Sequence, residues 1–150
     1  MFKMKLPTFK YSPNAYDIGV FKKEAGCCSV CNEQREIKYV GSFYSKNKPE
    51  YICPWCIANG TASQKYDGEF NDYFGIEGVS CDPADPLPTI DQELLLEITN
   101  KTPSYNSIQQ EVWLTHCNEP CVFTGYEEDG YGWFFSCVKC GEQRVHFDYD

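Results

Sequence analysis

"YICPWCIANG", residues Tyr51–Gly60, contains the tetrapeptide that decides the fold. A CPxC pair is either the dithiol of a redox enzyme or half of a zinc site, and these ten residues alone do not distinguish the two. A second CxxC pair precedes it and is separated from it by 21 residues. Two such pairs are typical of one zinc ion, because a two-residue spacer lets a single turn direct both sulfurs at the metal. The predicted ligands of this first site are Cys28, Cys31, Cys53 and Cys56.

Two alternatives concern the first site, which spans residues 27–56. Cys27 could replace its neighbour Cys28 in a looser CxxxC pair, although the CxxC spacing favours Cys28. A thioredoxin-like enzyme would need CPWC at the start of a helix within a βαβ framework, and the chain shows no clear second half of that fold. We therefore favour zinc, and we expect residues 37–52 to form a hairpin that brings the two pairs together.

A second site is predicted over residues 117–140, where a CxxxC pair and a CxxC pair are separated by 15 residues. A glycine follows the last cysteine, as is typical of zinc knuckles, since it lets backbone donors turn toward the thiolates. His116 could replace Cys117, but four sulfurs are available and we expect the histidine to lie at a helix end. The predicted ligands are Cys117, Cys121, Cys137 and Cys140, and the two cysteines predicted to lie outside both sites are Cys27 and Cys81.

Both predicted zinc ions are structural. Four protein ligands leave no position for water, whereas a catalytic zinc keeps one position open. The chain has only two histidines, His116 and His146, and neither lies in a metalloprotease motif or a recognisable triad. We therefore predict no catalytic residue, and we expect the protein not to be an enzyme.

The cysteine content also bears on the cellular compartment. There are 10 cysteines in 150 residues, far more than an ordinary intracellular domain carries. The N-terminus lacks the apolar run and cleavage site of a signal peptide, and no stretch approaches the ~18 apolar residues of a membrane-spanning helix. We expect a soluble, cytoplasmic protein with no membrane association. In a reducing cytosol, paired cysteines are more often metal ligands than disulfides.

The net charge limits the class of partner. The formal charge is -9, from 22 acidic and 13 basic side chains. Two zinc ions, each held by four thiolates, add -2 apiece and would lower it to about -13. Non-specific affinity for nucleic acids comes from clustered lysines and arginines, so a nucleic-acid partner is disfavoured. An acidic surface attracts a basic protein instead.

The hydrophobic pattern predicts a small α+β domain with short antiparallel strands and two or three helices. A helix is predicted over residues 88–103, with Thr89 as its N-cap and Gln92 completing a capping box. A second helix is predicted over residues 103–117, and strands over residues 37–44, 131–138 and 144–149.

A proline-rich loop is predicted at about residues 75–90, between the two cysteine clusters. We find no internal repeat at a fixed period, and we expect residues 1–150 to form one domain. Aromatic residues make up 16% of the chain, and most should pack the core. The segment "GYEEDGYGWFF", residues 125–135, is the first candidate for a contact surface.

An ordered series of motifs resembles a known family. The stretches are "LPTFKYSPNA", "CCSVC", "YICPWCIANGTASQKYDGEF", "KTPSYNSIQQEVWLTHCNEPC" and "FFSCVKCGEQR". Together they resemble the CbrC family of bacterial proteins, which are linked to colicin tolerance. The resemblance implies a small zinc-dependent protein whose CPWCIA-type motif falls on Cys53–Ala58 and whose HCxxxC-type motif falls on His116–Cys121. It implies no known reaction.

Three functions are compared. The first is a non-enzymatic zinc-binding module that binds a protein, such as a basic toxin domain, in colicin tolerance or immunity. The second is a nucleic-acid-associated zinc-ribbon protein, which the net charge opposes. The third is a thiol oxidoreductase that uses Cys53 and Cys56. We favour the first.

Overall fold

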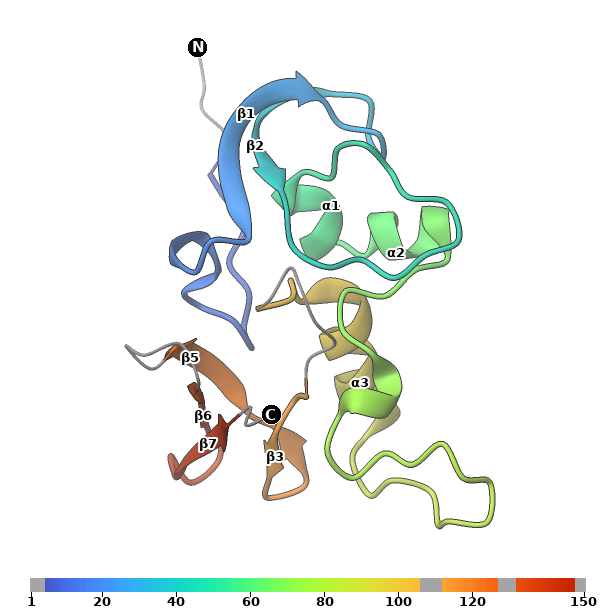
Figure 1. Ribbon diagram of the computed structural model, residues 1–150, viewed down its shortest axis with the longest axis vertical. Coiled ribbons are helices and arrows are strands. Elements are labelled where there is room, and N and C mark those ends of the chain that lie inside the picture. Colours follow the sequence, from blue (N-terminus) through green and yellow to red (C-terminus); the bar gives the residue numbers. More distant parts are fainter. Residues whose placement is uncertain (1–4, 106–111, 127–131, 148–150) are drawn as a thin grey trace.

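The computed structural model describes residues 5–105, 112–126 and 132–147, and it confirms the α+β class (Figure 1). All strand pairs are antiparallel, in two two-stranded sheets and one three-stranded sheet. The elements are η1 (Ala15–Asp17), β1 (Phe21–Cys27), β2 (Gln34–Tyr39), α1 (Pro54–Ala58), α2 (Thr61–Tyr66), η2 (Tyr73–Gly75), α3 (Gln92–Lys101), β3 (Thr115–His116), β4 (Glu119–Pro120), β5 (Val122–Tyr126), β6 (Gly132–Ser136) and β7 (Gln143–Phe147).

The first hairpin differs from the predicted one. β2 pairs with β1, which precedes it, so the turn of the hairpin carries the first cysteine pair. The prediction of a hairpin over residues 37–52 was therefore wrong. The chain still returns beside β2, because the backbone N–H of Tyr39 donates to the carbonyl of Ile52 at 2.9 Å. This return places the second cysteine pair next to the first.

The predicted helix over residues 88–103 is confirmed as α3, but its N-cap was assigned wrongly. Asp91 caps the helix, and its carboxylate accepts from the backbone N–H of Glu93 at 3.0 Å. Thr89 lies outside the helix and instead donates its hydroxyl to the side-chain oxygen of Asn118 at 3.0 Å. A carboxylate at the N-cap also interacts favourably with the helix dipole, which explains why Asp91 takes this position.

The second predicted helix, over residues 103–117, was wrong in its described part. Residues 103–105 and 112–114 are not helical, and Thr115–His116 form β3. Trp113 makes a bridge with Ile76, and both Trp113 and Leu114 are buried. Two consecutive buried side chains suit an extended segment enclosed on both sides, whereas short apolar runs alone do not separate strand from helix. Residues 106–111 of this prediction lie outside the described residues.

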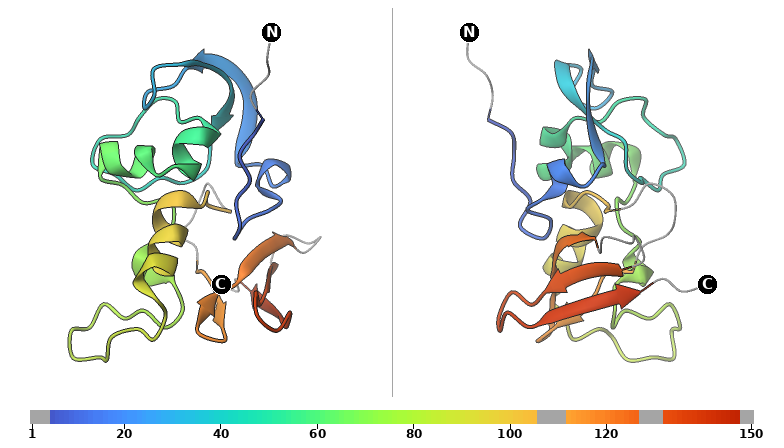
Figure 2. Two further views of the ribbon diagram at one scale, coloured as in Figure 1. Left: turned by 180° about the vertical axis from the view of Figure 1, so that it is seen from behind. Right: turned by 60° about the vertical axis from the view of Figure 1, so that its left-hand side comes forward.

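The C-terminal strand predictions are confirmed by β6 and β7, which form a three-stranded sheet with β5 (Figure 2). Residues 127–131 of the predicted contact surface lie outside the described residues. No helix or strand interrupts residues 77–91, which overlap most of the proline-rich loop predicted at about residues 75–90, and Figure 1 shows this segment projecting from the molecule beyond α3. Among the described residues, no helix has the length and apolar character needed to span a membrane.

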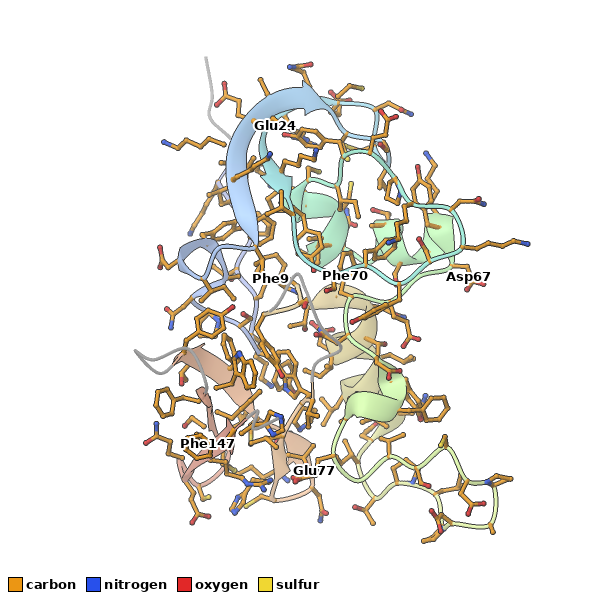
Figure 3. The ribbon with its side chains drawn as sticks, in the orientation of Figure 1. Phe9, Glu24, Asp67, Phe70, Glu77 and Phe147 are labelled. Carbon is orange, nitrogen blue, oxygen red and sulfur yellow. The ribbon has the colours of Figure 1, made fainter. Side chains whose placement is uncertain are left out.

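Two hydrophobic clusters form the core. The first lies among β1, β2, α1 and α2 and includes Phe9 and Phe70, whereas the second joins α3 to the C-terminal sheet and includes Trp113 and Phe135. Figure 3 places Phe9 and Phe70 near the middle of the molecule. Three of the cysteines in the 27–56 segment belong to the first cluster. The position of this cysteine group is therefore fixed by core packing.

Candidate metal centres

The first centre consists of four sulfurs that lie within 4.8 Å of one another: those of Cys28, Cys31, Cys53 and Cys56. The Sγ–Sγ distances are 3.9 Å for Cys28–Cys56, 3.9 Å for Cys31–Cys53 and 3.5 Å for Cys53–Cys56. A tetrahedral zinc ion with bonds of about 2.3 Å requires sulfur–sulfur edges of about 3.8 Å. A disulfide would bring two sulfurs to about 2 Å. This group could therefore hold a metal ion.

Two local structures present the four sulfurs. In the β1–β2 turn, Asn32 adopts the left-handed conformation at φ 62°, and its N–H donates to the carbonyl of Cys28 at 2.9 Å. The backbone N–H of Val30 points at the sulfur of Cys28, at 3.4 Å. The other pair opens α1, with Cys53 as the N-cap and Pro54 at the first helical position, where no amide hydrogen is needed. CPWC does begin a helix, but the described strands are all antiparallel, so no βαβ unit surrounds it.

The first centre is buried. Cys28 and Cys53 are 0% exposed and Cys56 is 2% exposed, whereas Cys31 is half-buried. Nη2 of Arg35 lies 3.6 Å from the sulfur of Cys31. Hydrogen bonds to Cys53 and then Cys56 lower the pKa of Cys28, whereas the hydrogen bond with Cys28 is the main cause that raises the pKa of Cys53 to about 11. Four thiolates cannot share this volume without a cation, and a divalent metal supplies that charge.

The second centre has a different ligand set from the predicted one. It brings together His116, Cys117, Cys137 and Cys140, with one ligand atom from each inside 4.8 Å. Nδ1 of His116 lies 3.2 Å from the sulfur of Cys117 and 3.4 Å from that of Cys140, and the two sulfurs are 3.9 Å apart. A tetrahedral zinc ion with about 2.3 Å and 2.0 Å bonds gives sulfur–nitrogen edges of about 3.5 Å. Three sulfurs and one nitrogen are a common zinc set.

Glu142 orients the histidine ring. Its Oε2 lies 2.7 Å from Nε2 of His116, on the opposite side of the ring from Nδ1. A histidine that binds a metal commonly donates its other ring N–H to a carboxylate, which fixes the tautomer. Glu142 therefore leaves Nδ1 of His116 free to act as the ligand.

Cys121 is not brought to the second centre. It is 0% exposed within the second hydrophobic cluster, its N–H donates to Leu114 at 2.9 Å, and its carbonyl accepts from Nε1 of Trp113 at 2.8 Å. Burial is the main cause that raises the pKa of its thiol to about 11. A protonated, buried thiol of this kind behaves as a small apolar side chain. Cys27 and Cys81 are exposed and lie outside both groups.

The second centre is built from two hairpin turns. His116 and Cys117 lie at the two-residue turn between β3 and β4, with Cys117 at φ 54° and Asn118 at φ 59°. Positive φ at both central residues is the signature of a type I′ turn. Cys137 and Cys140 occupy the turn between β6 and β7. Cys117 and Cys140 are exposed and only Cys137 is buried, so solvent reaches this centre.

The two centres share a repeated knuckle that sequence reasoning missed. Residues 28–35 read CSVCNEQR and residues 137–144 read CVKCGEQR. In both copies the first cysteine exchanges the same backbone hydrogen bonds, at 2.9 Å and 2.9 Å with Asn32 and Glu33, and at 3.0 Å and 2.8 Å with Gly141 and Glu142. The shared sequence pattern CxxC-x-EQR could have revealed this repeat. A search for repeats at a fixed period does not find it, because two copies do not establish a period.

Curated relatives align with most of the chain. A UPF0167 protein of Pseudomonas aeruginosa is 36% identical over 124 residues, which cover 80% of this chain and 63% of the relative. A UPF0167 protein of Mycobacterium bovis is 33% identical over 122 residues, which cover 81% of this chain and 60% of the relative. The chain thus spans about 60% of the length of these relatives. No solved structure matches the chain.

The family match corrects the assignment made from the motifs. A family model described as an uncharacterised protein family, UPF0167, matches residues 6–131. These residues include the whole first centre and the His116–Cys117 turn, but not the knuckle at Cys137–Cys140. The CbrC assignment was therefore wrong. A role in colicin tolerance or immunity rested on that assignment and is no longer supported. The chain belongs to the UPF0167 family.

Proposed function

We propose that this protein binds two zinc ions and that the first ion is structural. The observation that carries the proposal is the four-sulfur group of the first centre, whose sulfur–sulfur distances of 3.5–3.9 Å suit a tetrahedral ion. Tetrahedral sulfur ligation is typical of zinc or iron. The three sulfurs and one histidine of the second centre favour zinc for the pair.

The same geometry supports a non-enzymatic role for the CPWC motif. The attacking sulfur of a thiol oxidoreductase must reach the disulfide of its substrate. Cys53 is completely buried, and its sulfur lies 3.9 Å from that of Cys31, in the other pair. With four protein ligands, the metal has no open position for water. The motif therefore serves the fold, and we propose no catalysis at this centre.

We further propose that the partner is a basic protein. Four thiolates with Zn²⁺ add -2, and three thiolates with a neutral histidine add -1, so the formal -9 falls to about -12. An acidic surface attracts basic proteins and opposes phosphate backbones. Leu87 is 89% exposed in the proline-rich loop, and Phe74 is also exposed nearby in the chain, on η2. Single exposed apolar side chains are common on protein surfaces, so the partner proposal rests on the net charge and not on these two residues.

Elemental analysis tests the metal proposal directly. The untagged protein, purified without added metal, should contain about two zinc ions per chain, since each centre supplies the four ligands of one ion. Native mass spectrometry should give the same stoichiometry. Iron in place of zinc, or fewer than two zinc ions per chain, would contradict the proposal.

Affinity capture at increasing salt tests the partner proposal. Retention of a basic protein that weakens as the ionic strength rises is the expected result, because screening shortens the range of the attraction. Tight binding to DNA or RNA at physiological salt would contradict it and would favour the zinc-ribbon alternative.

A further inference from the structure

The repeated knuckle allows the two centres to be compared residue by residue. Cys31 and Cys140 are the last cysteines of their copies, and Arg35 and Arg144 follow them at the same spacing. Arg35 places Nη2 at 3.6 Å from the sulfur of Cys31, and its guanidinium carbon lies 4.6 Å from the centre of the Trp55 ring. The arginine therefore covers the one half-buried ligand of the first centre.

Arg144 does not cover its own centre in this way. Its Nη1 forms an ion pair with Glu77 and donates to the carbonyl of Thr115 at 2.7 Å. Cys140, the counterpart of Cys31, is exposed, and so is Cys117. An incoming ligand can therefore approach two of the three sulfurs of the second centre without opening the core.

Backbone conformation adds to this difference. Cys117 holds a left-handed φ of 54°. A β-carbon makes this conformation unfavourable, and asparagine or glycine normally takes such positions in a two-residue hairpin turn. Cys117 is therefore an exposed ligand on a turn whose backbone conformation is unfavourable for a cysteine.

We propose that the second centre is an exchangeable zinc site from which an incoming thiol removes the metal, whereas the first centre retains its ion. The proposal rests on the zinc-binding function proposed above. The incoming thiol loses its proton as its sulfur binds zinc, and the Cys117 sulfur takes up a proton as its bond to zinc breaks. The bonds to Cys140, Cys137 and Nδ1 of His116 are then exchanged one by one for bonds to further incoming ligands, and the two cysteine sulfurs take up the protons that incoming thiols release. No electron is transferred. The added activity is the donation of zinc to thiolate ligands.

The rate of zinc release tests the proposal. The two-zinc protein is mixed with the chromogenic chelator 4-(2-pyridylazo)resorcinol, with and without glutathione, and the absorbance of the zinc complex is followed. We expect two phases of one equivalent each, and the fast phase should accelerate with glutathione. Changes around a metal's ligands alter its affinity by about 10- to 100-fold, so the phases should differ at least about tenfold.

Variant proteins show which centre releases its zinc ion in each phase. Cys117→Ser should remove the fast equivalent and leave the slow one, while Cys121→Ser should keep both, because Cys121 is not brought to the centre. Arg35→Met should accelerate the slow phase about tenfold, because it removes the contact between the guanidinium group and the Cys31 sulfur. Arg35→Lys keeps a positive charge and should bring the rate of the slow phase part of the way back to that of the wild type. Cadmium-113 NMR of the wild-type chain gives an assignment that does not depend on variants, because a four-sulfur site resonates downfield of a site with three sulfurs and one nitrogen.

The outcomes separate this inference from the function on which it rests. A protein purified with fewer than two zinc ions contradicts the two-zinc function. Two equivalents that leave at one rate, or a Cys117→Ser protein that loses the slow phase, overturn the exchangeable site. An unchanged slow phase in Arg35→Met overturns the covering role of Arg35. Loss of the upfield cadmium signal before the downfield one on addition of glutathione supports the proposal.

Discussion

Replacing Cys56 by serine should remove the metal of the first centre and destabilise the domain. Cys56 is 2% exposed, lies in the first hydrophobic cluster, and places its sulfur 3.5 Å from that of Cys53 and 3.9 Å from that of Cys28. A serine hydroxyl is a poor zinc ligand at neutral pH. The variant therefore leaves three crowded cysteines around a site that can no longer hold its ion with four ligands.

The size of the effect follows from burial. Breaking a buried ionic interaction by removing one partner costs about 3–5 kcal/mol, and we use this range as a lower limit for removing one thiolate from a buried zinc ion. Structural zinc contributes roughly 10 kcal/mol of apparent binding free energy, which sets an upper limit near the net stability of a whole domain. At about 2–4 °C per kcal/mol for a chain of this size, the melting temperature should fall by at least about 6–12 °C.

Metal analysis and thermal unfolding followed by circular dichroism provide the assay. The zinc content should drop from about two ions per chain to about one. Cys27→Ser is the matched control, since Cys27 is an exposed cysteine directly before the ligand Cys28 and lies outside the four-sulfur group. A Cys56→Ser protein that retains both ions and its melting temperature would refute the reasoning, as would a Cys27→Ser protein that loses one ion.

Three further predictions concern separate features. Cys121→Ser should keep two zinc ions per chain but lower the stability by about 1–3 kcal/mol, because it places a hydroxyl in the second hydrophobic cluster. Asp91→Ala should cost about 1 kcal/mol in denaturant unfolding, whereas Thr89→Ala should cost much less, because only Asp91 caps α3. Zinc binding to the metal-free chain should release protons into a weakly buffered solution at neutral pH, because the pKa values of Cys53 and Cys117 are both raised to about 11. Zinc affinity should therefore rise with pH, and a titration without proton release would contradict this.

The sequence predicted the first centre well because its spacing suits two compact turns. A CxxC spacer closes one turn in a hairpin or at a helix start, so Cys28, Cys31, Cys53 and Cys56 come together in either local structure. The predicted grouping of the four cysteines therefore did not depend on the hairpin over residues 37–52, which was wrong. The choice of Cys28 over Cys27 also rested on this spacing, and the structure places Cys27 at the end of β1, outside the group.

Contacts that join distant segments could not be predicted in the same way. Arg35 and Glu142 act on their centres through side-chain directions that depend on the register of β1–β2 and β6–β7. Register depends on the pairing of the strands, and short apolar runs do not specify that pairing by themselves. The capping role of Asp91 was missed because Thr89 and Gln92 satisfied the capping-box pattern two residues too early.

The error at the second centre shows that ligand spacing has meaning only within a local conformation. On a helix, residues four apart share a face, so Cys117 and Cys121 could both have reached one metal. The chain instead forms a hairpin in which Glu119 pairs with His116 and Cys121 lies opposite Leu114. A strand rises about 3.4 Å per residue, so Cys121, three residues beyond Asn118, is carried roughly 10 Å from the turn, and its sulfur enters the core. Adjacent residues on a strand normally point to opposite faces, but the left-handed φ of 54° at Cys117 turns its side chain back toward His116. The same turn therefore keeps Cys121 away from the second centre and places His116 in it.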